Sequence, residues 1–256
     1  MRVIVMLRYT ELVKSMTIKE FKLRYRNSLF GFLWSLLNPL AMMVILTLVF
    51  STLLRGGMEN FPVFLLPALL VWRFFSIGTS MALWSIIGNA PLVTKVYFPR
   101  WLLVLSSNLA NLVGSTLEFL ASLPLLLALG MKLSWLTVLL PAVLAIEFVF
   151  IAGVSLPLAA LNVYYRDINQ IWEITLQAGF FLCPIIYSAN LVPSSYALLY
   201  SLNPMTRIIE STRKIFYYGT LPAAYDLAVP LLGGLILMMF GYAIFVRLEP
   251  RFAEEI

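Results

Sequence analysis

Residues 22–40, KLRYRNSLFGFLWSLLNPL, set the architecture of the chain. The stretch opens with three cations, Lys22, Arg24 and Arg26, and within four residues of the last one it is apolar enough to enter a membrane. Asn38 and Pro39 then interrupt the apolar part. Because Pro39 has no N–H to donate, it breaks the hydrogen-bond ladder of a helix, and a neighbouring helix or a cavity must satisfy the freed groups. The stretch predicts a basic cytoplasmic helix that leads into a bendable first span.

The composition is that of an all-α integral membrane protein. Of 256 residues, 61% are hydrophobic and 12% are charged, whereas a soluble domain carries roughly twice that charged fraction. A membrane-spanning helix needs about 20 apolar residues. Six stretches meet this need and are predicted spans, at residues 30–54, 62–86, 101–129, 136–161, 170–188 and 226–248. The fifth is short, and Pro184 interrupts it near its end.

The residue types that the chain lacks exclude several kinds of chemistry. The single cysteine, Cys183, excludes an internal disulfide and a multi-cysteine metal site, and the absence of histidine excludes histidine-based catalysis. No Gly-Lys pair occurs, so the chain has no phosphate-binding loop of the ATPase kind. We therefore expect no catalytic residue, metal or cofactor in this chain. An active transporter of this composition would need ATP and Mg bound to a separate ATPase.

The distribution of Lys and Arg predicts the orientation in the membrane. With the N-terminus inside, the cytoplasmic segments carry twelve of these cations, and the outer segments carry five, which are Arg55, Lys132, Arg207, Arg213 and Lys214. Both termini are therefore expected in the cytoplasm. No cleavable signal peptide is visible, because the N-terminus is a long charged amphipathic segment.

The first 26 residues are expected to form an interfacial helix on the cytoplasmic leaflet. Apolar side chains recur at helical spacing from Val5 to Met16, and residues 17–20, TIKE, fit a capping box that restarts the helix. After this restart, the cations lie on the face opposite Ile18 and Phe21. A simple anchor held by anionic lipid is the alternative.

The second cytoplasmic connection, residues 89–100, NAPLVTKVYFPR, has the signals of a short helix. Its first proline suits the first helical position and its second proline ends the helix, which leaves about two turns that present Val93, Val96 and Tyr97. A compact turn is the alternative. In the next cytoplasmic connection, Asp167 is expected to cap the following helix. Pairing of Asp167 with Arg166, or contact of the two with another chain, is the alternative.

The long outer segment, residues 189–225, contains two apolar pieces that are too short to cross a membrane. One covers residues 194–202, and the other covers residues 205–218 and ends at Gly219, in the position of a helix C-cap. Two helices that dip into the outer leaflet would narrow a pathway from outside. Extracellular padding is the alternative.

Ionisable groups within or near the spans are costly, and they normally face a partner or a water-filled cavity. Four residues are of this kind: Arg73, Glu118, Glu147 and Glu173. Pairing of Arg73 with a glutamate and a place on a transport pathway are both open. In the outer segment, Glu210 is spaced to pair with Arg213 or Lys214.

Several aromatic side chains are candidates for the lining of a conduit. Aromatic faces stack against the C–H groups of sugars and offer weak, repeated contacts to a sliding polymer. The candidates are Trp34, Phe180, Phe181 and Tyr187. Contact with lipid or with another helix is the alternative for each.

Residues 23–39, LRYRNSLFGFLWSLLNP, resemble the start of the first span in permeases of type-2 ABC exporters. The match is to the branch that moves lipid-linked polysaccharides, namely O-antigen, capsule and teichoic acid, and most to the O-antigen exporters. Three more stretches agree, at residues 89–100, 161–168 (LNVYYRDI) and 203–210 (NPMTRIIE). The similarity covers nearly the whole chain, in order.

The resemblance implies one transmembrane domain over residues 1–256. This domain consists of a cytoplasmic interfacial helix at 1–28, spans one to five at 29–188, an outer re-entrant segment at 189–225, and the sixth span with a cytoplasmic tail at 226–256. The resemblance also implies a homodimer in the bacterial cytoplasmic membrane that exports a polymer on undecaprenyl pyrophosphate. Its partners would be a second copy of the chain, two copies of a cytoplasmic ABC ATPase, the polysaccharide and membrane lipids, but no nucleic acid.

The resemblance further implies roles for particular residues. The gate and the coupling contact with the ATPase fall on Leu92, Lys95, Val96, Tyr97, Phe98 and Arg100. The cytoplasmic interface and the site of the lipid headgroup fall on Lys22, Arg24 and Arg26. The outer gate falls on Arg207, Glu210 and Arg213.

Other functions stay open on the sequence. A related permease for a drug or a small lipid would share the architecture. A membrane enzyme acting on lipid-linked sugars would need clustered acids or histidines, but the glutamates are scattered and histidine is absent. A secondary transporter is disfavoured because the sequence shows no internal repeat.

Overall fold

The computed structural model describes residues 2–26, 31–53, 59–131 and 134–256, and all regular structure in these residues is helical. The predicted all-α class is confirmed. The long helices are α1 (Arg2–Tyr25), α2 (Leu33–Thr47), α3 (Phe61–Trp84), α5 (Trp101–Ala128), α6 (Leu140–Tyr164), α7 (Ile168–Leu182) and α10 (Ala224–Leu248). The ends predicted for the first span, at residues 30 and 54, and the cations Arg55 and Lys132 lie outside the described residues.

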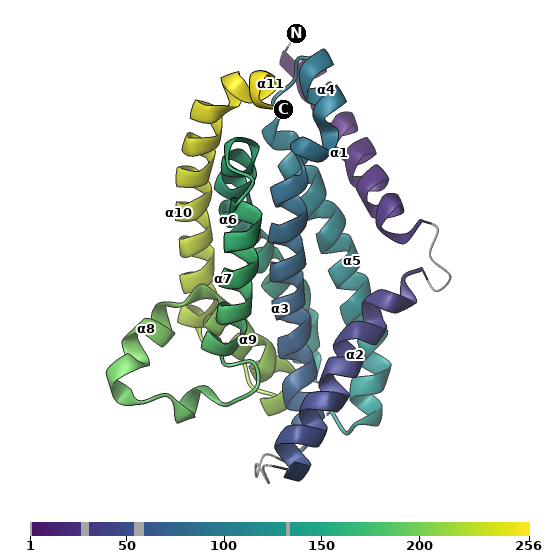
Figure 1. The fold of residues 1–256 in the computed structure, drawn as a ribbon. Coiled ribbons are helices and arrows are strands. Elements are labelled where there is room, and N and C mark those ends of the chain that lie inside the picture. The colour runs from purple at the N-terminus through teal and green to yellow at the C-terminus, as the bar shows by residue number, and fades with distance from the viewer. Residues whose placement is uncertain (1, 27–30, 54–58, 132–133) are drawn as a thin grey trace.

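Five helices in the described part of the chain are long and apolar enough to cross a membrane. They cover Leu33–Phe50, Phe61–Trp84, Trp101–Ala128, Trp135–Tyr164 and Ala224–Glu255, and they correspond to predicted spans one to four and six. Because α3 is apolar over most of its circumference, it occupies the centre of the bundle (Figure 1), with 78% of its span buried. The spans of α2 and α10 are only 17% and 22% buried and lie at the periphery.

The predicted fifth span, residues 170–188, is not one continuous helix, because the interruption expected at Pro184 falls after Leu182. α7 has 15 residues and ends at Leu182, which gives about 22 Å of helix against a hydrocarbon core of about 30 Å. The helix stops there because the ring of Pro184 disfavours helical backbone at Cys183, whose ψ is 147°. Asp167 stands directly before α7, but its side chain makes no capping hydrogen bond, so the predicted cap is wrong.

α6 and α10 pack along each other because glycines remove side chains from their contact. A Cβ on Gly234 would lie 2.9 Å from the backbone Cα of Phe150, and one on Gly153 would lie 2.8 Å from the carbonyl oxygen of Gly234. A Cβ on Gly241 would lie 2.7 Å from Pro157 Cδ. Small residues allow membrane helices to approach closely and gain packing contacts.

α1 is one uninterrupted helix, so the predicted capping-box restart at residues 17–20 is wrong. It runs lengthwise beside α5 (Figure 1). The hydroxyl of Thr17 donates to the carbonyl oxygen of Ser106 at 3.4 Å, and the hydroxyl of Ser106 donates to the carbonyl oxygen of Val13 at 3.5 Å. Thr17 therefore binds a neighbouring helix instead of starting its own.

Shorter elements join the long helices. They are η1 (Leu48–Leu53), η2 (Ile87–Asn89), α4 (Ala90–Lys95), η3 (Trp135–Leu139), η4 (Ala189–Leu191), η5 (Ser194–Tyr196), α8 (Ala197–Leu202), α9 (Pro204–Arg213), η6 (Lys214–Tyr218), η7 (Glu249–Arg251) and α11 (Phe252–Glu255). Both ends of the chain lie beside α4 and α11 at one end of the bundle, whereas α8 and α9 lie at the other (Figure 1).

The two apolar pieces of the outer segment are helical, as predicted. α9 starts at Pro204 because the side chain of Asn203 accepts a hydrogen bond from the backbone N–H of Met205 at 3.0 Å. The helical run ends at Gly219, whose φ of 64° is the left-handed conformation that a glycine C-cap supplies.

Candidate functional site

The first part of the candidate site is an exposed turn after α4. α4 ends at Lys95, and Val96 has extended backbone, so the predicted helix around residues 92–98 is one turn too long at its end. Val96 is half exposed, and Tyr97 is 99% exposed, so its ring is uncovered. A large aromatic side chain left fully in solvent is typical of a contact with another chain.

Three other predicted coupling residues pack or bond on the buried side of this turn. Phe98 is buried and packs against a small apolar cluster, and Leu92 is partly buried against the same cluster. The backbone N–H of Arg100 donates to Glu249 Oε1 at 2.8 Å, and its Nη1 donates to the carbonyl oxygen of Glu249 at 2.6 Å. Arg100 Nη2 also donates to the carbonyl oxygen of Val93 at 3.4 Å. Arg100 therefore fixes α4 and the start of α5 to the end of α10.

The second part is the basic end of α1. Lys22 and Arg26 are exposed, whereas Lys19 Nζ donates to Asn89 Oδ1 at 2.8 Å. Arg24 turns inward and donates from Nη1 to Asn111 Oδ1 on α5 at 3.1 Å. The three predicted headgroup cations thus separate, because two face outward and Arg24 points into the bundle.

A carboxylate that two guanidiniums share forms the third part. Glu118 on α5 is 2% exposed, and its Oε2 lies 3.1 Å from Arg73 Nε, so Arg73 does pair with a glutamate, which was one of the two roles left open for it. Arg24 Nη2 lies 3.6 Å from the other oxygen of Glu118. Arg73 also donates from Nη1 to Asn38 Oδ1 at 3.3 Å, beside the buried Pro39. The polar interruption of the first span therefore meets a charged partner on α3.

Two other membrane acids differ from Glu118. Glu147 on α6 is fully buried, and neither carboxyl oxygen has a hydrogen-bond partner among the described residues. Glu173 on α7 is exposed and accepts a hydrogen bond from Asn169 Nδ2 at 2.9 Å. Of these three acids, Glu118 is the one that pairs with cations from other helices in the described part of the chain.

α7 carries a polar stripe that the sequence analysis missed. Gln170, Glu173 and Gln177 are exposed and recur at positions i, i+3 and i+7, which places them on one face. No residue of α7 is buried within the chain. The signal was the spacing of these residues, which the apolar average of the stretch conceals.

The predicted conduit residues lie on α2, on α7 and on the turn after α7. Trp34 on α2 and Phe181 on α7 are exposed, whereas Phe180 packs edge-on against Trp72 with ring centroids 6.1 Å apart. The hydroxyl of Tyr187 donates to the carbonyl oxygen of Phe181 at 3.0 Å. Tyr187 therefore holds the turn after α7 and lies beyond the helix.

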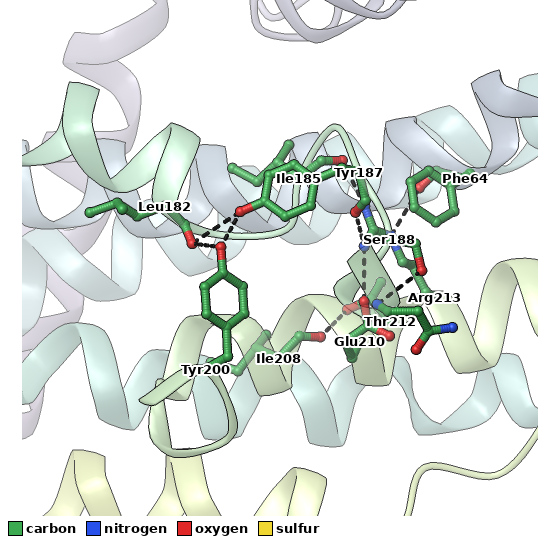
Figure 2. A network of polar contacts seen from close by, with 11 residues as sticks. Phe64, Leu182, Ile185, Tyr187, Ser188, Tyr200, Ile208, Glu210, Thr212 and Arg213 are labelled. Carbon is green, nitrogen blue, oxygen red and sulfur yellow. Dashed lines mark hydrogen bonds and ion pairs between the residues drawn. The ribbon is translucent and has the colours of Figure 1, made fainter. Parts of the chain in front are cut away.

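The predicted outer-gate residues lie in two buried networks. In the first, Arg213 is fully buried and donates to Glu210 Oε1 at 2.9 Å, which confirms the predicted pair (Figure 2). Its guanidinium also binds the carbonyl oxygens of Ile185 at 2.6 Å and Tyr187 at 3.3 Å, and it stacks on the ring of Phe64 at 3.6 Å.

The second network centres on Asp226, at the start of α10. This carboxylate is fully buried, and it receives Arg207 Nη1 at 3.1 Å and Lys214 Nζ at 2.6 Å. Arg207 also stacks over the ring of Tyr225 at 4.7 Å. The sequence analysis missed Asp226, because it lies 12 residues from its nearer partner.

These features define an all-helical membrane protein whose buried polar residues join its helices through ion pairs and hydrogen bonds. No group of three His, Cys, Asp or Glu side chains in the described residues is placed to hold a metal ion. The chain belongs to the family of ABC-2 type transporters, which it matches over residues 11–217.

Three relatives cover nearly the whole chain. It is 35% identical to the O-antigen export system permease protein RfbA of Myxococcus xanthus, over 97% of this chain and 96% of that protein. It is 32% identical to the protein of the same description from Klebsiella pneumoniae, over 95% of this chain and 94% of that protein. The polysialic acid transport protein KpsM of Escherichia coli is 23% identical, over 91% and 92%.

Proposed function

We propose that this chain is the permease subunit of an ATP-driven exporter that moves a polysaccharide of the O-antigen type, linked to undecaprenyl pyrophosphate, across the cytoplasmic membrane. One observation carries the proposal. The chain is similar, almost from end to end, to permeases described as O-antigen exporters, and also to a polysialic acid transport protein.

A homodimer with six spans in each subunit fits the exposed helices. The polar stripe on α7 would be costly against lipid, so water or a second subunit must cover it. α7 lies beside the central helices, and a second copy facing it would enclose a polar passage between the two chains. In this arrangement α7 crosses the membrane together with the turn that follows it, and α8 and α9 close the outer end.

ATP hydrolysis is assigned to a separate chain that docks at the turn after α4. Tyr97 and Val96 offer an apolar contact, and the neighbouring Lys95 adds a charge. The brace between Arg100 and Glu249 gives this turn a rigid base, which a coupling element needs to transmit motion. Both termini share this end of the bundle, which agrees with two cytoplasmic termini (Figure 1).

Deleting the gene in its own host tests the proposed function. Polysaccharide should disappear from the cell surface and accumulate inside on its lipid carrier, and the wild-type gene should restore export. Normal surface polysaccharide in the deletion strain would contradict the proposal.

Replacing Tyr97 by alanine is expected to reduce export at least about tenfold, since an exposed aromatic anchor contributes roughly 2 kcal/mol or more to an interface. The variant should insert and melt like the wild type, because nothing in the described structure packs on this ring. Tyr196→Ala, an exposed tyrosine at the other end of the bundle, is the matched control and should export normally. If Tyr97→Ala and Tyr196→Ala exported equally, Tyr97 would not be part of the coupling contact.

A further inference from the structure

The shared carboxylate leaves an excess of positive charge inside the bundle. Arg24 and Arg73 come from different helices and meet at Glu118. The three groups together carry a charge of +1 if the carboxyl is ionised and +2 if it is protonated. Both states give these three groups a net positive charge beside mid-helix positions of α3 and α5, where charge is costly.

The guanidinium groups suit a phosphate ligand. A guanidinium offers five N–H donors in a planar fork that matches the oxygens of phosphate. Arg73 uses Nε for Glu118 and Nη1 for Asn38, while its Nη2 has no partner among the described residues. Glu118 holds the two forks beside each other, so that two adjacent phosphates could each meet one.

A groove lies next to this cluster along α1 and α3. It lies between α1 and α3, holds about 470 Å³, and is lined by Lys19, Glu20 and Leu23 on one side and by residues from Ser80 to Asn89 on the other. Arg24 directly follows Leu23 on α1. Arg73 lies seven residues before Ser80 on α3, which is two turns further along the same face. Lys19 therefore lines the groove, and Arg24 and Arg73 follow its lining residues along α1 and α3.

We propose that Arg24 and Arg73 form a binding site for the diphosphate headgroup of a polyprenyl lipid, with Glu118 as the residue that positions both guanidiniums. The proposal rests on the proposed function and names a site for the charged end of its substrate. An anionic headgroup entering along the groove would compensate the excess charge. The polyprenyl chain would stay in the lipid beside α2, the least buried of the candidate spans.

Binding of farnesyl diphosphate to the purified chain in lipid nanodiscs tests the site. Arg73→Gln should weaken binding at least tenfold, and Arg251→Gln, which changes an exposed cytoplasmic arginine, should not change it. Glu118→Gln keeps a hydrogen-bond acceptor but removes the competing negative charge, so binding should become about threefold tighter. Arg73→Lys keeps the charge without the fork and should fall between the wild type and Arg73→Gln.

The sign of the Glu118→Gln effect separates a binding site from a structural cluster. If Glu118→Gln and Arg73→Gln weaken binding equally, the proposed diphosphate site is wrong. It is also wrong if Arg73→Gln melts normally and binds farnesyl diphosphate as the wild type does. Inorganic pyrophosphate should bind at least tenfold more weakly than farnesyl diphosphate, and vesicles of phosphatidylglycerol should not compete. Equal binding of pyrophosphate, or full competition by phosphatidylglycerol, would overturn the assignment to a polyprenyl diphosphate.

The same variants distinguish this proposal from the proposed function. If the deletion strain loses export and Arg73→Gln restores it fully, the exporter stands and the headgroup site fails. If farnesyl diphosphate binding depends on Arg73 but the deletion strain exports normally, the headgroup site stands and the exporter fails.

Discussion

Arg213→Gln is expected to lower the melting temperature of the purified chain by roughly 10 °C or more and to abolish export. The Arg213 guanidinium is fully buried and pairs with Glu210 inside α9. It also ties α9 to α3 through Phe64 and to the turn after α7 through Ile185 and Tyr187. Breaking a buried ion pair by removing one partner costs about 3–5 kcal/mol, because the other partner keeps its desolvation cost without compensation. The carbonyl oxygens left behind add to this cost.

Two variants control for charge and for surface effects. Arg213→Lys keeps the charge but cannot reach all the acceptors at once, so its melting temperature should lie between those of Arg213→Gln and the wild type. Arg251→Gln, which changes an exposed arginine near the C-terminus, should melt like the wild type. If Arg213→Gln melted within a few degrees of the wild type, the network in Figure 2 would not hold the outer segment in place.

Gly234→Ala is expected to destabilise the chain by about 1–3 kcal/mol, the usual cost of overpacking a close contact. The added methyl group would lie 2.9 Å from the backbone N and Cα of Phe150, and backbone cannot swing away as a flexible side chain can. α6 and α10 would have to separate along their whole contact. The loss of stability should appear as a lower melting temperature in mild detergent and as a smaller amount of folded protein in the membrane.

The neighbouring glycine provides the matched control for Gly234→Ala. Gly233→Ala makes the same change in helix propensity one residue earlier, but its methyl group would lie 3.3 Å from Pro204 Cγ, a side-chain atom. This contact needs a shift of only a few tenths of an ångström, so Gly233→Ala should lie much closer to the wild type. Equal melting temperatures for the two variants would show that the glycine contact between α6 and α10 is not tight.

The sequence predicted the features that depend on local signals. Long apolar runs predicted the five helices that are long enough to span a membrane. Gly219 predicted where the helical run that starts at Pro204 ends. The interruption expected at Pro184 sets the end of α7, because the residue before a proline avoids helical backbone and Cys183 precedes Pro184. The capping-box prediction at residues 17–20 failed because a threonine inside a helix can bond to a neighbouring helix instead.

The contacts that build the candidate site are long-range and could not be predicted from spacing. Arg100 and Glu249 are 149 residues apart, and Arg24 lies 87 residues from Asn111. The rule that a membrane charge needs a partner or a water-filled cavity left pairing with a glutamate as one of two roles open for Arg73. It could not choose among Glu118, Glu147 and Glu173, and it gave no reason to expect that Arg24 shares the same carboxylate.

The most direct test of the exporter account is a photo-crosslink from position 97 in living cells. Tyr97 is replaced by p-benzoylphenylalanine in the tagged chain in its own host, and the crosslinked partner is identified after purification in mild detergent. The account predicts an ATPase with a phosphate-binding loop, captured from position 97 and absent when the crosslinker stands at Tyr196. It also predicts that this ATPase co-purifies with the unmodified chain in equal amount. A chain that yields no ATPase by either route would contradict the assignment of this protein as the permease subunit of an ATP-driven exporter.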